Sequence, residues 1–141
     1  MVTSYEEKDL ADIFLPVGQM LQVHKIGHVS DGKIVGERRI SEEDWFFPLH
    51  FPSDPIFPGS LLIEGAGQVV AIWGWASGLR GKPRLVKVAA EFRSPVSPCD
   101  YLLTYVGTVK KRNNICMGRV EIKVGERFVA EVSVTLVVLD E

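Results

Sequence analysis

A long, almost entirely apolar run constrains the fold of this chain more than any other feature. Only three residues between positions 61 and 79 are polar: Glu64, Gln68 and Ser77. A proline-studded loop precedes this run and ends at Pro58, so we expect Ser60 to be the N-cap of a helix over 61–79. A helix that is apolar on nearly every side is buried on nearly every side. The uncharged stretch Gly65–Leu79 has 15 residues, fewer than the roughly 20 that span a bilayer. The run therefore predicts a core helix rather than a membrane anchor.

Glu64 is unusual in such a helix. It lies four residues before Gln68, so the two side chains share one face. A carboxylate among apolar residues is costly unless it is neutralised or finds partners. One explanation is a glutamate in the first turn that complements the helix dipole. The other is acid–base chemistry, because His50 lies in the rigid loop just upstream, also among apolar residues.

Two stretches of the sequence carry a resemblance to a known family. The first consists of His50-Phe51-Pro52, Asp54-Pro55, Pro58-Gly59, Leu61, Glu64 and Gln68. The second is the turn Phe92-Arg93-Ser94-Pro95-Val96-Ser97-Pro98-Cys99-Asp100. Both resemble the active-site loop, helix and downstream turn of the 3-hydroxyacyl-[acyl-carrier-protein] dehydratases of fatty-acid synthesis (FabZ/FabA type). The spacing of 14 positions between the histidine and the acid is also that of the family.

The chain departs from the family pattern at several positions. Leu49, Ser53 and Cys99 stand where glycines are usual. The Asp54-Pro55 pair is similar to the branch that also isomerises the double bond, but that branch uses aspartate as its acid. Glu64 is similar to the branch that only dehydrates. Chain length, isomerase activity and the pathway, fatty acid or polyketide-like, therefore stay open.

The resemblance implies a lyase that removes water from a (3R)-3-hydroxyacyl thioester to give the trans-2-enoyl thioester. His50 would be the base, and Glu64 the acid, directly or through a water held with Gln68. The backbone N–H of Gly59, at the start of the helix, would bind the thioester oxygen. In the family the histidine and the acid of one site come from different subunits, and the acyl chain is carried on an acyl-carrier protein.

The two phenylalanines beside the histidine have two interpretations. Phe47 and Phe51 bracket His50 in the sequence. They either line a channel for the acyl chain or only close one end of the core. Trp45 is expected to do the latter.

The rest of the chain predicts an antiparallel sheet. Alternating apolar residues and turn residues indicate strands over 19–28, 33–40, 84–93, 101–111, 115–124 and 127–139. A capping box from Ser4 to Glu7 favours a helix near 4–14. One apolar helix laid on such a sheet is an α+β arrangement. The resemblance implies the hot-dog fold, a curved antiparallel sheet wrapped round the long central helix, in one domain over 1–141. The uncovered helix surface and open sheet edges predict a homodimer or a trimer of dimers.

Composition and charge exclude several function classes. A net charge of −2 gives no support for a nucleic-acid partner. The first residues lack the pattern of a signal peptide, and the two cysteines have no metal spacing, so we expect a cytoplasmic protein with free thiols. No metal or cofactor is implied, and His24 and His28 are expected at the surface or in packing. Arg38 and Arg39 are expected to face solvent or to pair with acids.

A basic cluster follows the helix. Its members are Arg80, Lys82, Arg84, Lys87 and Arg93. It either serves solubility and the helix dipole or docks an acidic carrier protein.

The whole chain has two alternative functions: a hot-dog thioesterase, or a non-catalytic acyl-binding subunit of a dimer.

Overall fold

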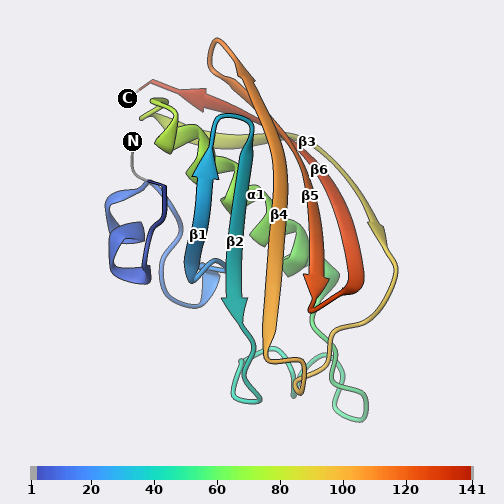
Figure 1. Cartoon of the computed structure of the whole chain (residues 1–141). Coiled ribbons are helices and arrows are strands. Elements are labelled where there is room, and N and C mark those ends of the chain that lie inside the picture. Colours follow the sequence, from blue (N-terminus) through green and yellow to red (C-terminus); the bar gives the residue numbers. More distant parts are fainter. Residues whose placement is uncertain (1–2, 141) are drawn as a thin grey trace.

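The fold is one antiparallel sheet curved round one long helix (Figure 1). The computed structural model describes residues 3–140. The helix α1 spans Gly59–Ala76, and two short 3-10 helices, η1 (Glu7–Asp12) and η2 (Gly18–Met20), precede the sheet. The strands are β1 (Lys25–Ser30), β2 (Lys33–Arg39), β3 (Lys82–Phe92), β4 (Leu102–Arg112), β5 (Ile115–Val124) and β6 (Arg127–Leu139). They form one six-stranded sheet in the order β1-β2-β4-β5-β6-β3. The predicted α+β class and the helix laid against the sheet are confirmed.

The helix starts two residues earlier than expected. The carbonyl of Pro58 already accepts hydrogen bonds from the N–H groups of Leu61 and Leu62, at 3.0 and 3.2 Å. Pro58, with an extended backbone, therefore occupies the N-cap position, and no side chain caps this end. The prediction of Ser60 as N-cap was wrong, because proline can occupy this boundary without losing a helical hydrogen bond. The helix ends at Ala76, and Gly78 follows in the left-handed region with φ of +107°.

The N-terminal segment differs most from the sequence prediction. The expected helix near 4–14 is the shorter 3-10 helix η1, and its capping acid is Asp9, whose carboxylate accepts from the N–H of Glu6 at 2.8 Å. The capping box from Ser4 to Glu7 was wrong. The predicted strand 19–28 also begins late. Its first residues form η2, and ladder pairing starts only at Lys25.

The remaining strands agree closely with the sequence. The Asp31-Gly32 turn joins β1 to β2, and Gly32 has φ of +89°, which glycine adopts without strain. The strands β5 and β6 have the predicted limits. The strand β3 lies at the edge of the sheet and pairs within residues 3–140 with β6 alone. Its apolar side chains remain largely exposed, Val86 at 64% of its surface.

The core lies between the concave side of the sheet and α1. Inward side chains of β2, β4, β5 and β6 contact one side of the helix, where Ala66, Val69 and Ile72 are fully buried. The opposite side of α1 is only half-buried. No helix within residues 3–140 is long and apolar enough to cross a membrane.

Candidate active site

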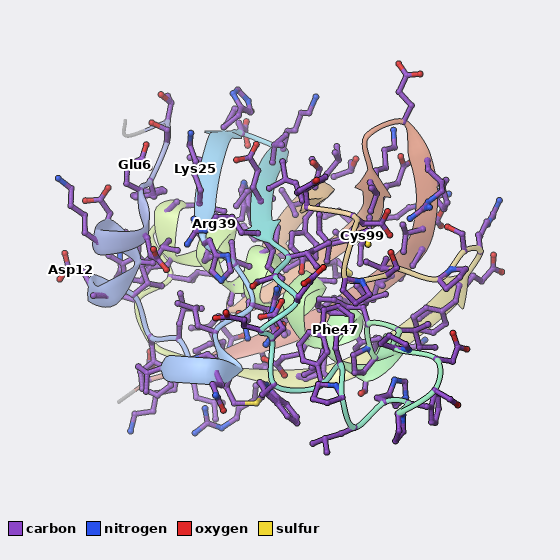
Figure 2. The ribbon with its side chains drawn as sticks, turned by 90° about the horizontal axis from the view of Figure 1, so that it is seen from below. Glu6, Asp12, Lys25, Arg39, Phe47 and Cys99 are labelled. Atoms are coloured by element: carbon purple, nitrogen blue, oxygen red, sulfur yellow. The ribbon has the colours of Figure 1, made fainter. Side chains whose placement is uncertain are left out.

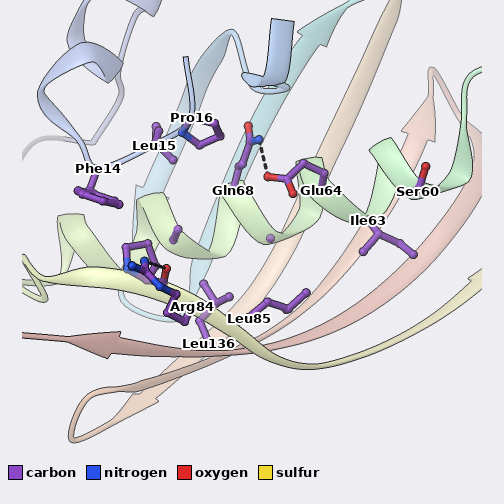
Figure 3. A pocket seen from close by; sticks show the side chains of 13 residues that line it. Phe14, Leu15, Pro16, Ser60, Ile63, Glu64, Gln68, Arg84, Leu85 and Leu136 are labelled. Carbon is purple, nitrogen blue, oxygen red and sulfur yellow. Dashed lines mark hydrogen bonds between the residues drawn. The ribbon is translucent and has the colours of Figure 1, made fainter. Parts of the chain in front are cut away.

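A pocket of about 480 Å³ lies against the side of α1 that the sheet leaves uncovered (Figure 3). Its walls come from α1, from the segment that follows η1, and from the strands β3 and β6. The lining residues are Phe14, Leu15, Pro16, Ser60, Ile63, Glu64, Gly67, Gln68, Ala71, Pro83, Arg84, Leu85 and Leu136. The pocket is mostly apolar, and Glu64 and Arg84 are its charged groups.

Glu64 projects from the second turn of α1 into this pocket and is held by Gln68 (Figure 3). The side-chain Nε2 of Gln68 donates to Oε2 of Glu64 at 2.8 Å and to the carbonyl oxygen of Met20 at 2.8 Å. The Oε1 of Gln68 accepts from the backbone N–H of Gln22 at 2.7 Å. The sequence predicted that Glu64 and Gln68 share one face of the helix, and in the structure their side chains are hydrogen-bonded to each other. The alternative of a first-turn glutamate was wrong, because α1 begins at Gly59 and its first turn contains no acid.

A buried arginine continues this polar arrangement away from the pocket. Arg38 is only 3% exposed, and its Nε donates to Oε1 of Gln22 at 3.0 Å. Its terminal nitrogens bind the carboxylate of Asp44 at 3.1 and 3.4 Å. Of the two alternatives for Arg38, solvent exposure was wrong and pairing with an acid is confirmed. Arg39 lies toward η1 (Figure 2), exposed and 3.2 Å from the carboxylate of Glu7.

Sequence reasoning found Glu64 and Gln68 by their spacing but missed Gln22 and Arg38. Both of the latter lie in segments that alternate like ordinary half-exposed strands. Nothing in the sequence near them indicates that their partners are 16 to 46 positions away. Phe14, Leu15 and Pro16 were not assigned to the pocket either.

His50 lies in the loop before α1 and is half-buried. Its Nδ1 is 3.2 Å from the carbonyl oxygen of Ile56, and its ring stacks on Phe51 with centroids 4.2 Å apart. Since a carbonyl can only accept, Nδ1 carries the proton in this contact and Nε2 of the neutral ring is unprotonated. An unprotonated Nε2 can act as a base. His50 does not line the pocket that contains Glu64, so the described chain does not bring the two groups together in that pocket.

The other predicted site residues are spread around the start of α1. Phe47 is 2% exposed and packs on Phe46 and Phe57, with ring centroids 4.7 and 6.3 Å away. Phe51 is 49% exposed. Neither ring lines the pocket beside Glu64. Gly59 is tightly packed, because a Cβ at this position would lie 3.0 Å from the ring of Phe92.

A family model described as a FabA-like domain matches residues 14–133. The chain belongs to the FabA-like domain family. It is similar to a protein of Paramagnetospirillum magneticum named 3-hydroxyacyl-[acyl-carrier-protein] dehydratase FabZ, with 35% identity over 91% of this chain and 80% of that protein. A FabZ of Fusobacterium nucleatum is 31% identical over 90% of this chain and 88% of the relative.

Solved structures agree with the fold of this FabA-like domain. AziG of S. sahachiroi superposes with a TM-score of 0.64 at 21% identity, covering 82% of this chain and 90% of AziG. A thioesterase of Staphylococcus aureus superposes with a TM-score of 0.65 at 14% identity, covering 80% of this chain and 90% of the other. These likenesses concern the fold alone, and they confirm the hot-dog architecture.

Other polar groups of the FabA-like domain lie outside the pocket. His24 is half-buried, and its Nδ1 accepts from the N–H of Arg39 at 2.9 Å. Burial, followed by the positive charges of Arg38 and Arg39, lowers the pKa of His24. His28 is exposed and lies 3.0 Å from the hydroxyl of Ser30. Within residues 3–140, no three histidine, cysteine or acidic side chains gather in a way that could hold a metal.

Proposed function

We propose that this FabA-like domain, spanning 1–141, is a hydro-lyase that converts (3R)-3-hydroxyacyl thioesters on an acyl-carrier protein into trans-2-enoyl thioesters. The pathway would be fatty-acid or polyketide-like synthesis. The observation that supports the proposal most directly is the carboxyl of Glu64, held by Gln68 at the wall of an apolar pocket. It occurs in a chain 31–35% identical to proteins named as such dehydratases.

The two proposed catalytic groups divide the elimination between them. The Nε2 of His50 takes the proton from C2, and the electrons of that C–H bond form the C2–C3 double bond. The hydroxyl at C3 leaves with a proton from Glu64, as water. The neutral tautomer of His50 that the Ile56 carbonyl favours is the form that the first step requires.

Charge that develops on the thioester oxygen needs a donor. The first hydrogen bond within α1 is donated by Leu61, so the N–H groups of Gly59 and Ser60 have no acceptor inside the helix. The positive end of the helix dipole adds a favourable field there. We assign the N–H of Gly59 to the thioester oxygen.

The proposed site is completed by a second copy of the chain. In the part of the chain that the structure describes, His50 is not among the residues that line the pocket of Glu64, and β3 exposes apolar side chains, of which Leu85 lines that pocket. A homodimer, alone or within a trimer of dimers, would cover that edge and supply His50 of one copy to Glu64 of the other. An acyl-carrier protein is the expected partner and the cytoplasm the expected location, which fits the free thiols of Cys99 and Cys116.

The decisive experiment follows enoyl formation in two variants. His50→Ala removes the base, and Glu64→Gln removes the titrating acid while preserving its volume. Each change should lower kcat by about 10²- to 10⁴-fold. The double variant should lose much less than the product of the two losses, because both groups act in one elimination. The melting temperature should hold or rise, since a carboxylate kept for chemistry usually lowers stability.

Matched controls separate chemistry from folding. His28→Ala and Glu43→Gln remove the same groups from exposed positions and should keep wild-type turnover. If Glu64→Gln unfolds the protein or turns over near the wild-type rate, Glu64 is structural and the mechanism is wrong. Release of free thiol in place of enoyl product would identify a thioesterase, and neither product would identify an acyl-binding subunit. A panel of chain lengths in the same assay measures preference and isomerisation.

A further inference from the structure

The amide of Gln68 has only one possible orientation. Its Oε1 faces the backbone N–H of Gln22, which can only donate, and its Nε2 faces the carbonyl of Met20, which can only accept. Flipping the amide would oppose donor to donor and acceptor to acceptor. The second hydrogen of Nε2 therefore always points at Oε2 of Glu64, 2.8 Å away. Oε2 can accept but cannot hold a proton of its own toward Gln68.

The side chain of Gln22 is fixed by the same logic. Its Oε1 accepts from Nε of Arg38 at 3.0 Å, and its Nε2 donates to the carbonyls of Gln19 at 3.0 Å and Met20 at 3.4 Å. The guanidinium can only donate and the two carbonyls can only accept. Gln22 therefore clamps the segment from η2 to β1, and this segment supplies both groups that orient Gln68.

Arg38 is in turn held on every side. Besides Gln22 and Asp44, its guanidinium donates to the carbonyl of Arg39 at 2.6 Å. Its charged end lies 4.9 Å from the ring centroid of Phe57 and 5.6 Å from that of Phe46. A buried guanidinium with these partners is a rigid donor, since leaving it unpaired would be strongly destabilising. Glu64 is thus connected to a fixed positive charge through two amides of fixed direction.

We propose that Arg38 and Gln22 are positioning residues for the proton donor of the reaction. They lock Gln68 so that Oε2 of Glu64 always accepts, and Oε1 alone carries the proton that leaves with the substrate hydroxyl. The proton passes from Oε1 to the oxygen at C3 as the C3–O bond breaks, and the resulting carboxylate keeps its bond from Gln68. This inference rests on the proposed function, because it assigns the atom that performs one of its steps.

The test compares two arginines on one strand. Arg38→Met removes the buried guanidinium, whereas Arg39→Met removes the exposed neighbour and serves as the matched control. Displacing a catalytic group by about 1 Å can lower the rate by about 10²-fold. Arg38→Met should therefore lower kcat by about 10- to 100-fold with KM nearly unchanged. Arg39→Met should leave both constants unchanged. In a Glu64→Gln background Arg38→Met should lower the residual rate by less than about twofold, because its effect passes through Glu64.

Three results would overturn the inference while leaving the proposed function intact. They are an active Arg38→Met variant that matches the control, a loss confined to KM, and an equal loss with and without the carboxyl of Glu64. An inactive wild type would instead refute the proposed function. If Arg38→Met fails to fold, Gln22→Met gives the same readout with nearly constant volume.

A measurement on the wild type needs no folded variant of the network. The two side-chain amide protons of Gln68 should both exchange slowly with water, since both are hydrogen-bonded. Exchange as fast as that of an exposed glutamine amide would mean that the amide is not locked, and the inference would be wrong.

Discussion

We expect the buried hydroxyl of Tyr105, on β4, to lower the free energy of unfolding relative to a phenylalanine at the same position. The side chain is fully buried, and its oxygen is the one buried side-chain polar atom within residues 3–140 that has no hydrogen-bond partner. It packs against the backbone of Gly65, where a Cβ would clash with it. Burying an unpaired hydroxyl costs about 1–3 kcal/mol in mutational data. Removing it forfeits a few dispersion contacts of about 0.1–0.2 kcal/mol each. Tyr105→Phe should therefore raise the free energy of unfolding by about 1 kcal/mol at neutral pH.

The same substitution should have a larger effect at high pH. Burial, opposed in part by the charge of Arg38, raises the pKa of Tyr105 above its ordinary value. Above pH ~10 the phenol of the unfolded chain loses a proton that the native phenol keeps. The unfolded state then binds fewer protons, so the stability of the wild type falls by up to about 1.4 kcal/mol per pH unit. Phenylalanine does not titrate, and the advantage of Tyr105→Phe should widen as the pH rises through this range.

Urea unfolding at neutral pH and near pH ~11 measures both effects. The two proteins must be compared at one chain concentration, because an oligomer unfolds in a concentration-dependent manner. Tyr101→Phe is the matched control, since this tyrosine is 81% exposed, and it should change stability by less than about 0.5 kcal/mol. A Tyr105→Phe variant that is less stable at neutral pH would show that the hydroxyl is hydrogen-bonded, and the reasoning would be refuted.

Two further predictions concern assembly and partner binding. Val86→Lys places a charge on the exposed edge strand β3. If that edge pairs with a second copy, light scattering should show monomers, and enoyl formation should be lost. A fully active monomer would contradict the site shared between two copies. The double variant Arg80→Glu, Lys82→Glu should raise KM for carrier-bound substrate and barely change KM for a pantetheine thioester. An equal loss of activity on both substrates would mean that the basic cluster has a structural role, such as the contact of the Arg80 guanidinium with the Trp75 ring, 3.7 Å from its centroid.

Local patterns were sufficient for most of the fold. The strands β5 and β6 alternate between apolar and polar residues over 120–124 and 132–136, and their predicted limits agree with the structure. The helix was predicted from its apolar run, but its start was misplaced because Pro58 was taken to exclude helix rather than to begin it. Apolar residues that recur every two or every 3.6 positions identify the buried face of a strand or helix well, but they locate its first and last residues poorly.

The segment before β1 could not be predicted from local patterns. Its alternating residues are typical of a strand, yet the backbone of Met20 and Gln22 bonds to the side chain of Gln68, 48 and 46 positions away. The same holds for the site. The spacing of Glu64 and Gln68 is a local property of one helix, whereas the contact of Arg38 with Gln22 exists only once two distant segments are packed together.

One difference between sequence and structure has a physical explanation in the proposed assembly. The apolar run predicted a helix buried on every side, yet a stripe along α1 that includes Ile63, Gly67 and Ala71 is only half-buried in the chain. Leu85, one of the exposed apolar side chains of β3, lines the same pocket as this stripe. Contiguous apolar surface of this kind is typical of an interface. A second copy seated there would bury the stripe and pair the open edge. It would also bring a histidine loop to Glu64. In that proposed assembly α1 would be buried on every side, as its sequence predicts, and the half-buried stripe would be the surface that one chain alone leaves uncovered.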